Sequence, residues 1–368
     1  MRIVFVGGGT AGHVNPALSI ASVMKENISD IQIDFIGTPT GIENTLVKNA
    51  GYNIYHVDCA GLRRSLSPRN LLLPIKIIGA IRKSEKILAS LRPNIVIGTG
   101  GYVCYPVLRA AQKMKIKTII HESNAIPGLT VRLLAKKANL VMLNFDECKK
   151  YLRRKDNITV TGNPTSHNFS SQKRESCRRE LGIGENQKFV LSFGGSIGAE
   201  HLNDACLTVM SEMRGDRSVC FLHATGERNF SDCENKAKAL GIGKNSRIVP
   251  YINDMWRVMT AADIVISRAG AMTLSELAIS GKASILVPSP YVTGNHQYKN
   301  AMALKNAGAA VIVEESELAG GGLRTALVSL LSSDKQRYEM QKNITTFARK
   351  NANRDIFDAI MKTVKQQE

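Results

Sequence analysis

Residues 7–13 form the first stretch of the sequence whose groups could bind a charged ligand. The letters GGGTAGH follow the apolar run IVFV and precede a helix-like segment, so a glycine turn joins a strand to a helix. The N–H groups of such a turn and of the helix N-terminus bind phosphate or another negative group. His13 follows directly, which places an imidazole beside whatever the turn binds, or else in a capping or packing role.

The same letters match the G-x-G-x-x-G pattern of dinucleotide sites at Gly7, Gly9 and Gly12. A dinucleotide fold also needs an acidic residue at the end of its second strand, where the acid holds a ribose. Here the corresponding run, IQIDFIGTPTG, ends in Gly37 and Thr38. The sequence therefore argues against a nicotinamide oxidoreductase.

Three more glycine turns follow apolar runs, at residues 97–111, 192–204 and 266–282. Four turns exceed what one dinucleotide site uses, and both halves of the chain contain them. We therefore expect one ligand in a cleft between two domains. In the last turn we expect a helix to begin near Ala271 to Thr273, with Glu276 in its first turns.

A carboxylate at Glu276 can accept two hydrogen bonds from ribose hydroxyls while the helix start faces a diphosphate. Equally, it can be a favourable partner of the helix dipole. The segment 287–301 is rich in Pro and Gly, and we expect a loop there. It contains His296, Gln297 and Asn300, whose neutral polar groups suit sugar hydroxyls.

Short apolar runs alternate with helix-length segments throughout, which predicts the α/β class with parallel sheets covered on both faces. The design of strand, glycine turn and helix starts again near residue 188, so we expect two Rossmann-like domains. The polar run at 162–164 suits a linker. We place the domains at 1–163 and 164–349, with a C-terminal helix at about 350–368 joining the first domain.

Composition indicates a soluble protein with an anionic partner. The 368 residues are 43% hydrophobic and 22% charged, and the seven cysteines form no C-x-x-C pair, so we expect a cytosolic chain with reduced thiols. The net charge is +18, and residues 1–160 hold 23 basic against 10 acidic residues. Nucleic acid is disfavoured as the partner because only 5% of residues are aromatic and no nucleic-acid motif is present.

A family resemblance adds to these observations. The chain contains, in order, GGGTAGHVNPAL, GTGGYVCYPV, HESNAIPGLTVRLLAKKA, TGNP, FGGSIGA, SRAGAMTLSELAISGKASILVPSPYVTGNHQYKNA and NAGAAVIVEE. This ordered set resembles the MurG family, GT-B enzymes that transfer N-acetylglucosamine (GlcNAc) from UDP-GlcNAc to lipid I, undecaprenyl-diphospho-muramyl-pentapeptide, giving lipid II in peptidoglycan synthesis. The resemblance implies inverting transfer without a metal or cofactor, at the cytoplasmic face of the membrane.

The resemblance also implies roles for particular residues. Ile252 would contact uracil through its backbone, and Glu276 would hold the ribose. The diphosphate or sugar would be bound by Ser196, Ala271, Met272 and Thr273, and the GlcNAc hydroxyls by Asn124, His296 and Gln297. The acceptor side would be lined by Thr10, Ala11, Gly12 and His13. Ala11 replaces a family glycine, so a left-handed backbone there would be strained.

Inverting transfer needs a base for the attacking muramyl O4 hydroxyl. We assign His13 to this role because imidazoles titrate near neutral pH, and Glu122 is the second candidate. The rival enzymes are a UDP-GlcNAc 2-epimerase and another glycolipid glycosyltransferase of the same fold.

A lipid-linked acceptor also requires contact with a membrane. Residues 62–92 interleave basic with apolar residues, with Glu85 the sole acid among them, and this pattern suits an anionic membrane surface. The basic residues are Arg63, Arg64, Arg69, Lys76, Arg82, Lys83, Lys86 and Arg92. The alternative for this segment is a helix that covers a sheet and presents a solvated basic face.

Overall fold

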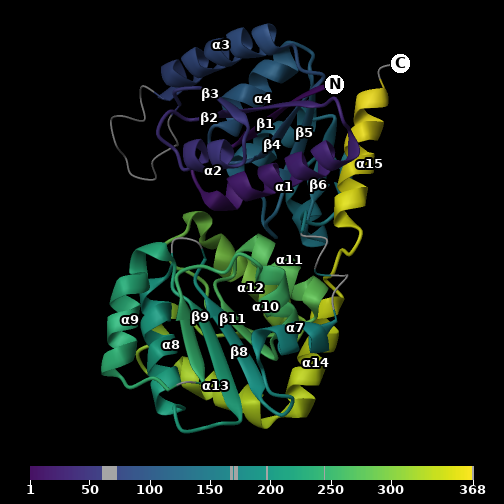
Figure 1. Cartoon of the computed structure of the whole chain (residues 1–368). Coiled ribbons are helices and arrows are strands. Elements are labelled where there is room, and N and C mark those ends of the chain that lie inside the picture. The colour runs from purple at the N-terminus through teal and green to yellow at the C-terminus, as the bar shows by residue number, and fades with distance from the viewer. Residues whose placement is uncertain (60–72, 166–168, 170–172, 196–197, 244, 367–368) are drawn as a thin grey trace. The chain divides into compact units, whose positions relative to one another are not determined.

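Contacts between residues divide the chain into two units, Met1–Pro164 with Asn351–Glu368, and Thr165–Lys350. The structure is a computed structural model, and it describes residues 1–59, 73–165, 169, 173–195, 198–243 and 245–366. Figure 1 shows the helices and strands of both units.

The first unit contains a parallel sheet with the strand order β3-β2-β1-β4-β5-β6-β7. Its described strands are β1 (Arg2–Gly7), β2 (Gln32–Gly37), β3 (Asn53–His56), β4 (Ile95–Gly100), β5 (Lys117–Glu122), β6 (Leu140–Leu143) and β7 (Ile158–Val160). Its described helices are α1 (Ala11–Asn27), α2 (Glu43–Asn49), α3 (Leu73–Leu91), α4 (Cys104–Lys113), α5 (Leu129–Leu134) and α15 (Ala352–Lys365), with short 3-10 helices η2 (Ala135–Lys137) and η3 (Asp146–Tyr151).

Alternation along β1 explains how this sheet is buried on both faces. Ile3 and Phe5 pack with residues of α1, α2 and α15, whereas Val4 and Val6 pack with residues of α3, α4 and α5. Figure 1 shows α15 beside α1, although more than 300 residues separate them in the sequence. The helix expected at the C-terminus is therefore present, and it contributes Ile356 and Ile360 to this core.

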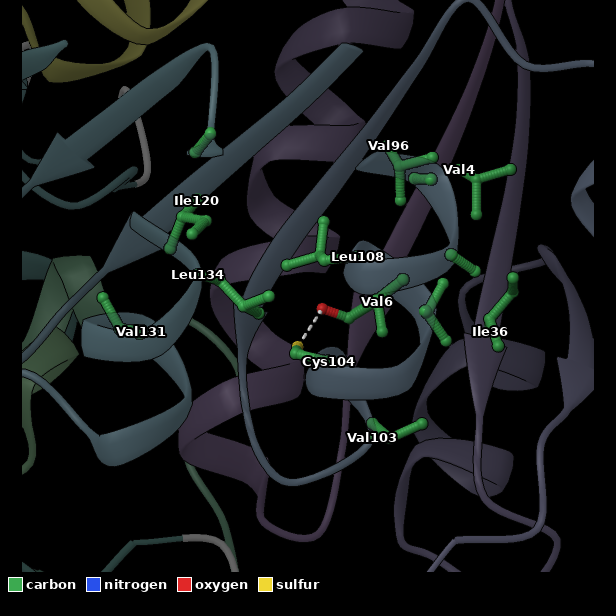
Figure 2. Packing of buried hydrophobic residues seen from close by; sticks show 14 of the residues in the cluster. Val4, Val6, Ile36, Val96, Val103, Cys104, Leu108, Ile120, Val131 and Leu134 are labelled. Carbon is green, nitrogen blue, oxygen red and sulfur yellow. Dashed lines mark hydrogen bonds between the residues drawn. The ribbon is translucent and has the colours of Figure 1, made fainter. Parts of the chain in front are cut away.

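The hydrophobic cluster on the second face of the sheet includes residues next to two of the glycine turns. Figure 2 shows Val4, Val6, Val96 and Leu108 in this cluster, with the Cys104 thiol donating to the Val6 carbonyl oxygen at 3.1 Å. Burial raises the pKa of the Cys104 thiol to about 12, so this cysteine is an inert packing group. The Cys104 thiol also donates to the Gly100 carbonyl oxygen at 2.9 Å, which ties the β4–α4 turn to this cluster.

The second unit contains a parallel sheet with the strand order β10-β9-β8-β11-β12-β13. Its described strands are β8 (Lys188–Phe193), β9 (Val219–Ala224), β10 (Ser246–Val249), β11 (Ile264–Ser267), β12 (Ala283–Leu286) and β13 (Val311–Ile312). Its described helices are α7 (Arg174–Leu181), α8 (Glu200–Glu212), α9 (Phe230–Ala239), α10 (Met255–Ala261), α11 (Ala271–Ser280), α12 (His296–Asn306), α13 (Gly322–Ser332) and α14 (Asp334–Thr345), with η4 (Glu227–Asn229), η5 (Thr293–Asn295) and η6 (Glu315–Glu317).

Both sheets are parallel in every described strand pair, so in each unit the carboxyl ends of the strands lie at one edge. Ligands of open α/β sheets bind at that edge. The predicted parallel α/β class is confirmed. In each unit, the candidate site residues are therefore expected at the edge where the strands end.

Candidate active site

The β1–α1 turn and the β4–α4 turn fit against each other at the carboxyl edge of the first sheet. The Gly8 N–H donates to the Gly100 carbonyl oxygen at 3.4 Å. Gly9, Gly100 and Gly101 have φ angles of +82°, +119° and +88°, which L side chains rarely adopt. A Cβ on Gly101 would overlap the Gly8 carbonyl oxygen. Glycine therefore allows the two turns to touch, and this contact shapes the surroundings of His13.

The His13 ring is held by both turns. Its Nδ1 atom lies 3.2 Å from the Gly8 carbonyl oxygen and 3.2 Å from the Thr10 hydroxyl oxygen. The Thr99 hydroxyl donates to the His13 carbonyl oxygen at 2.6 Å. A Cβ on Gly100 would overlap ring atom Cδ2. The structure thus brings Thr10 and His13 together and leaves the imidazole little freedom to rotate.

Ala11 is accommodated without backbone strain. It is the first residue of α1, after the extended N-cap Thr10, and Gly12 follows it in the helix. The left-handed backbone of this turn falls on Gly9 instead. The strain expected from replacing a family glycine at Ala11 is therefore absent, because this position is helical.

Glu122 and Asn124 form a local network at the end of β5. The Glu122 side chain is buried, and its Oε1 accepts from the Asn124 backbone N–H at 2.9 Å and from Asn124 Nδ2 at 3.0 Å. Its Oε2 accepts from the Gly128 N–H at 3.0 Å. Burial raises the pKa of Glu122 above its ordinary value, although these hydrogen bonds oppose the rise. With both oxygens engaged, the geometry suits a group that orients Asn124.

Sequence analysis missed two buried titratable groups in the first unit, Glu43 and His121. Glu43 is fully buried and accepts hydrogen bonds from Thr38 and Gly9. His121 Nε2 donates to the Gly162 carbonyl oxygen at 3.1 Å, and burial lowers the pKa of His121 to about 4, so its ring is neutral. The available signal was weak, because neither residue belongs to a motif whose spacing indicates a catalytic or binding role.

In the second unit, the expected start of the helix that carries Glu276 is confirmed. Helix α11 begins at Ala271, with Gly270 as its N-cap, and Met272 and Thr273 are partly exposed in its first turn. Glu276 lies in the second turn, and burial raises its pKa to about 7. A carboxyl with this pKa exchanges its proton easily near neutral pH. Ile252 is 8% exposed and lies just after β10.

Ser196 lies outside the described residues, and so do Arg63, Arg64, Arg69, Leu71 and Leu72 of the basic segment. The described part of the β8–α8 turn includes Gly195 and Gly198, with φ angles of +94° and +82°. A Cβ on Gly198 would overlap the Thr225 carbonyl oxygen, so this turn too depends on close backbone approach.

The loop expected to carry His296, Gln297 and Asn300 is shorter than predicted. These residues belong to α12, which begins at His296, because Gly294 and Asn295 supply the left-handed backbone that turns the chain into the helix. Asn300 is fully buried in α12, which makes it unsuited to reading a ligand. Gln297 Oε1 accepts from the Ser289 N–H at 2.9 Å, so Gln297 ties the helix start to the segment after β12.

Arg268, in the second unit, is a third residue that sequence analysis missed. It follows β11, donates to the Val287 carbonyl oxygen at 3.1 Å and forms a paired contact with the Glu315 carboxylate. The pair connects the ends of three neighbouring strands. A cavity of about 870 Å³ lies beside it, lined by residues of α8, the segment after β12 and residues 314–324, and none of Ile252, Ala271, Glu276 and Gln297 lines it.

Among the residues that the structure places, no three His, Cys, Asp or Glu side chains gather as metal ligands would. Nor does any helix within the described ranges have the length and apolar character needed to cross a bilayer.

Two Rossmann-like units, each a parallel sheet with glycine turns at its carboxyl edge, define the GT-B fold class. Residues 3–143 match the family model of the glycosyltransferase family 28 N-terminal domain. Residues 189–356 match the family model of the glycosyltransferase family 28 C-terminal domain. The chain belongs to glycosyltransferase family 28.

Relatives that align with nearly the full length of the chain support this assignment. The chain is 42% identical over 339 residues to the UDP-N-acetylglucosamine–N-acetylmuramyl-(pentapeptide) pyrophosphoryl-undecaprenol N-acetylglucosamine transferase of Caldicellulosiruptor saccharolyticus, covering 92% of this chain and 91% of the relative. The structure of Acinetobacter baumannii MurG matches with a TM-score of 0.78 at 28% identity, and the match covers 98% of this chain and 99% of that one. A UDP-GlcNAc 2-epimerase from Neisseria meningitidis matches with a TM-score of 0.63 at 14% identity, and the match covers 98% of this chain and 100% of that one. At this identity the match shows a shared fold alone.

Proposed function

We propose that this chain transfers GlcNAc from UDP-GlcNAc to the muramyl O4 of lipid I, forming lipid II for peptidoglycan. The observation that carries the proposal is the 42% identity, over nearly the whole chain, to a transferase named for this donor and acceptor. The epimerase alternative is not favoured, because its resemblance is limited to the fold.

The second unit supplies the donor site in this proposal, apart from Asn124 of the first unit. Glu276, as a carboxylate, accepts hydrogen bonds from the two ribose hydroxyls, and Ile252 contacts uracil through its backbone. The α11 N-terminus at Ala271 to Thr273 stabilises the diphosphate, with Ser196 beside it. The sugar hydroxyls are read by Gln297, whose amide is oriented by its bond to Ser289, together with His296 and Asn124.

The first unit supplies the acceptor site and the base. His13 takes the proton of the muramyl O4 hydroxyl as O4 attacks the anomeric carbon of GlcNAc, and the bond from that carbon to the diphosphate oxygen breaks. UDP leaves with the electron pair of that bond, and attack from the opposite face inverts the anomeric centre. Thr10, Ala11 and Gly12 line the acceptor, and Glu122 orients Asn124. No metal or cofactor takes part in the proposed reaction.

Helix α3 is the proposed contact with an anionic membrane. Its buried face comprises Ala80, Ser84, Leu88 and Leu91. Its other residues include Ile75 and Ile78, which are 67% and 52% exposed, and the exposed cations Lys76, Arg82, Lys83 and Lys86. Exposed isoleucines beside cations are typical of a surface that lies on anionic lipid. The enzyme would thus act at the cytoplasmic face as a peripheral protein, without nucleic acid as a partner.

The test is transfer of labelled GlcNAc from UDP-GlcNAc to a short-chain lipid I analogue in the presence of EDTA, with a control lacking acceptor. We expect an acceptor-dependent product with an inverted, β-configured linkage. Conversion to UDP-ManNAc without acceptor would instead assign the site to epimerisation. A product that disappears with EDTA would contradict the metal-free mechanism.

A further inference from the structure

Glu43 is a fully buried carboxylate for which the proposed reaction has no role. It is the first residue of α2, and its Oε1 accepts from the Thr38 N–H at 2.8 Å and from the Thr38 hydroxyl at 2.7 Å. Its Oε2 accepts from the Gly9 N–H at 3.1 Å. Burial by itself disfavours the ionised form, but these hydrogen bonds outweigh it, so the pKa of Glu43 is lowered and the group carries a negative charge at neutral pH.

Three glycine positions are shaped around this side chain. A Cβ on Gly8, Gly37 or Gly41 would overlap atoms of the Glu43 side chain. Gly8 belongs to the β1–α1 turn, whereas Gly37 ends β2 and Gly41 belongs to the β2–α2 turn. Glu43 therefore fills the space between two turns at the carboxyl edge and connects them through its two oxygens.

The contact with Gly9 reaches His13 through a single peptide group. The Gly9 N–H and the Gly8 carbonyl are the two ends of the same peptide unit, which is planar and conjugated. Glu43 Oε2 accepts from the N–H end at 3.1 Å, and His13 Nδ1 lies 3.2 Å from the carbonyl end. An anion that accepts from the N–H end polarises the peptide, so its carbonyl oxygen becomes a stronger acceptor.

The chemistry of these atoms decides which ring nitrogen carries the proton. A carbonyl oxygen can only accept, so Nδ1 of His13 must donate to Gly8. The Thr10 hydroxyl, 3.2 Å from the same nitrogen, can accept as well. In a neutral imidazole that is protonated at Nδ1, the basic lone pair is on Nε2.

We propose that Glu43 is a positioning residue that acts on His13 through the Gly8–Gly9 peptide. The carboxylate holds this peptide so that its carbonyl keeps His13 in the Nδ1–H tautomer, with Nε2 as the atom that takes the proton of the acceptor hydroxyl. The buried negative charge also stabilises the imidazolium formed in that step. The catalytic part of the proposal rests on the role of His13 given above, whereas the tautomer part does not.

Nitrogen-15 NMR of the imidazole rings tests the tautomer directly. The chain has seven histidines, and a His13→Gln variant identifies the resonances of His13. At about pH 8.5, where an ordinary imidazole is neutral, we expect the wild-type protein to be protonated at Nδ1 of His13. The carboxylate accepts from Gly9 with one oxygen and from Thr38 with the other, whereas the amide of Glu43→Gln has a single accepting oxygen. The variant should therefore hold the Gly8–Gly9 peptide less firmly, and we expect a mixture of His13 tautomers. Protonation at Nε2 of His13 in the wild-type protein would overturn the proposal even if Glu43→Gln does not fold.

Kinetics with a matched control test the consequence. We expect Glu43→Gln to lower kcat by about tenfold to a hundredfold, part of what a general base contributes, with the KM for UDP-GlcNAc unchanged. The control is Asp34→Asn, which removes another buried carboxylate of the same unit, paired with Arg2 at 3.3 Å. It should keep both the tautomer and kcat.

The outcomes separate this inference from the proposed function. An unchanged tautomer in Glu43→Gln overturns the positioning role. A changed tautomer with unchanged kcat supports the contact and overturns the role of His13 as base. Equal losses of kcat in Glu43→Gln and Asp34→Asn would mean that Glu43 contributes stability alone.

Discussion

Glu122 and Asn124 are joined twice, because one carboxylate oxygen of Glu122 accepts from both the backbone N–H and the side-chain amide of Asn124, at 2.9 and 3.0 Å. The arrangement fixes the direction of the Asn124 amide at the end of β5. Losing such an acceptor in a buried site costs about 1–3 kcal/mol.

The first prediction concerns this pair. We expect Glu122→Gln and Asn124→Ala each to raise the KM for UDP-GlcNAc and lower kcat, and the double variant to lose less than the sum of the two effects. Steady-state kinetics of the four proteins give the coupling energy, which is about 0.5–3 kcal/mol for residues in one network. Additive losses would show that Glu122 does not act through Asn124.

The second prediction is a pH dependence of donor binding. Because the pKa of Glu276 is raised to about 7, the carboxylate is the main form above pH 7 and the neutral acid below it. Ribose hydroxyls donate to the carboxylate, so we expect the KM for UDP-GlcNAc to rise about tenfold per pH unit below 7. In Glu276→Gln the KM should be high and independent of pH between 6 and 8. A wild-type KM that stays constant over this range would argue against Glu276 as the ribose ligand.

The third prediction concerns the base. We expect His13→Ala to lower the single-turnover rate of transfer by about 10²- to 10⁴-fold. Binding of UDP-GlcNAc, measured by calorimetry, should stay unchanged, because His13 is not among the residues proposed to bind the donor. Wild-type activity in His13→Ala would remove His13 from the reaction.

The fourth prediction concerns the membrane surface. Each basic residue near anionic lipid contributes about 1 kcal/mol, so neutralising Arg82, Lys83 and Lys86 to Gln should weaken binding to anionic vesicles about a hundredfold. A control with the same charge change uses the exposed Lys335, Lys342 and Lys350 of the second unit. Vesicle sedimentation compares the two triple variants. If both bind equally well, the assignment of α3 is wrong.

Sequence patterns predicted the local features of this fold well. The alternation of apolar runs and helical segments predicted two parallel sheets, and the start of α11 at Ala271 followed from a glycine after a strand. The loop expected for 287–301 was too long, because Gly294 and Asn295 turn the chain into α12 at His296 and the Pro-rich composition ends before them. In each case the deciding information was local, within a few residues of the element concerned.

The sequence by itself determined the α/β class, the positions of the glycine turns and the residue types available for chemistry, because strand and helix periodicities and turn propensities act over short stretches of chain. Only the tertiary structure decided which of these residues meet. Glu43 reaches Gly9, and Thr99 reaches His13, because β2 and β4 lie on either side of β1 in the sheet. Strand order depends on how the whole sheet buries its two faces, and no local pattern encodes it.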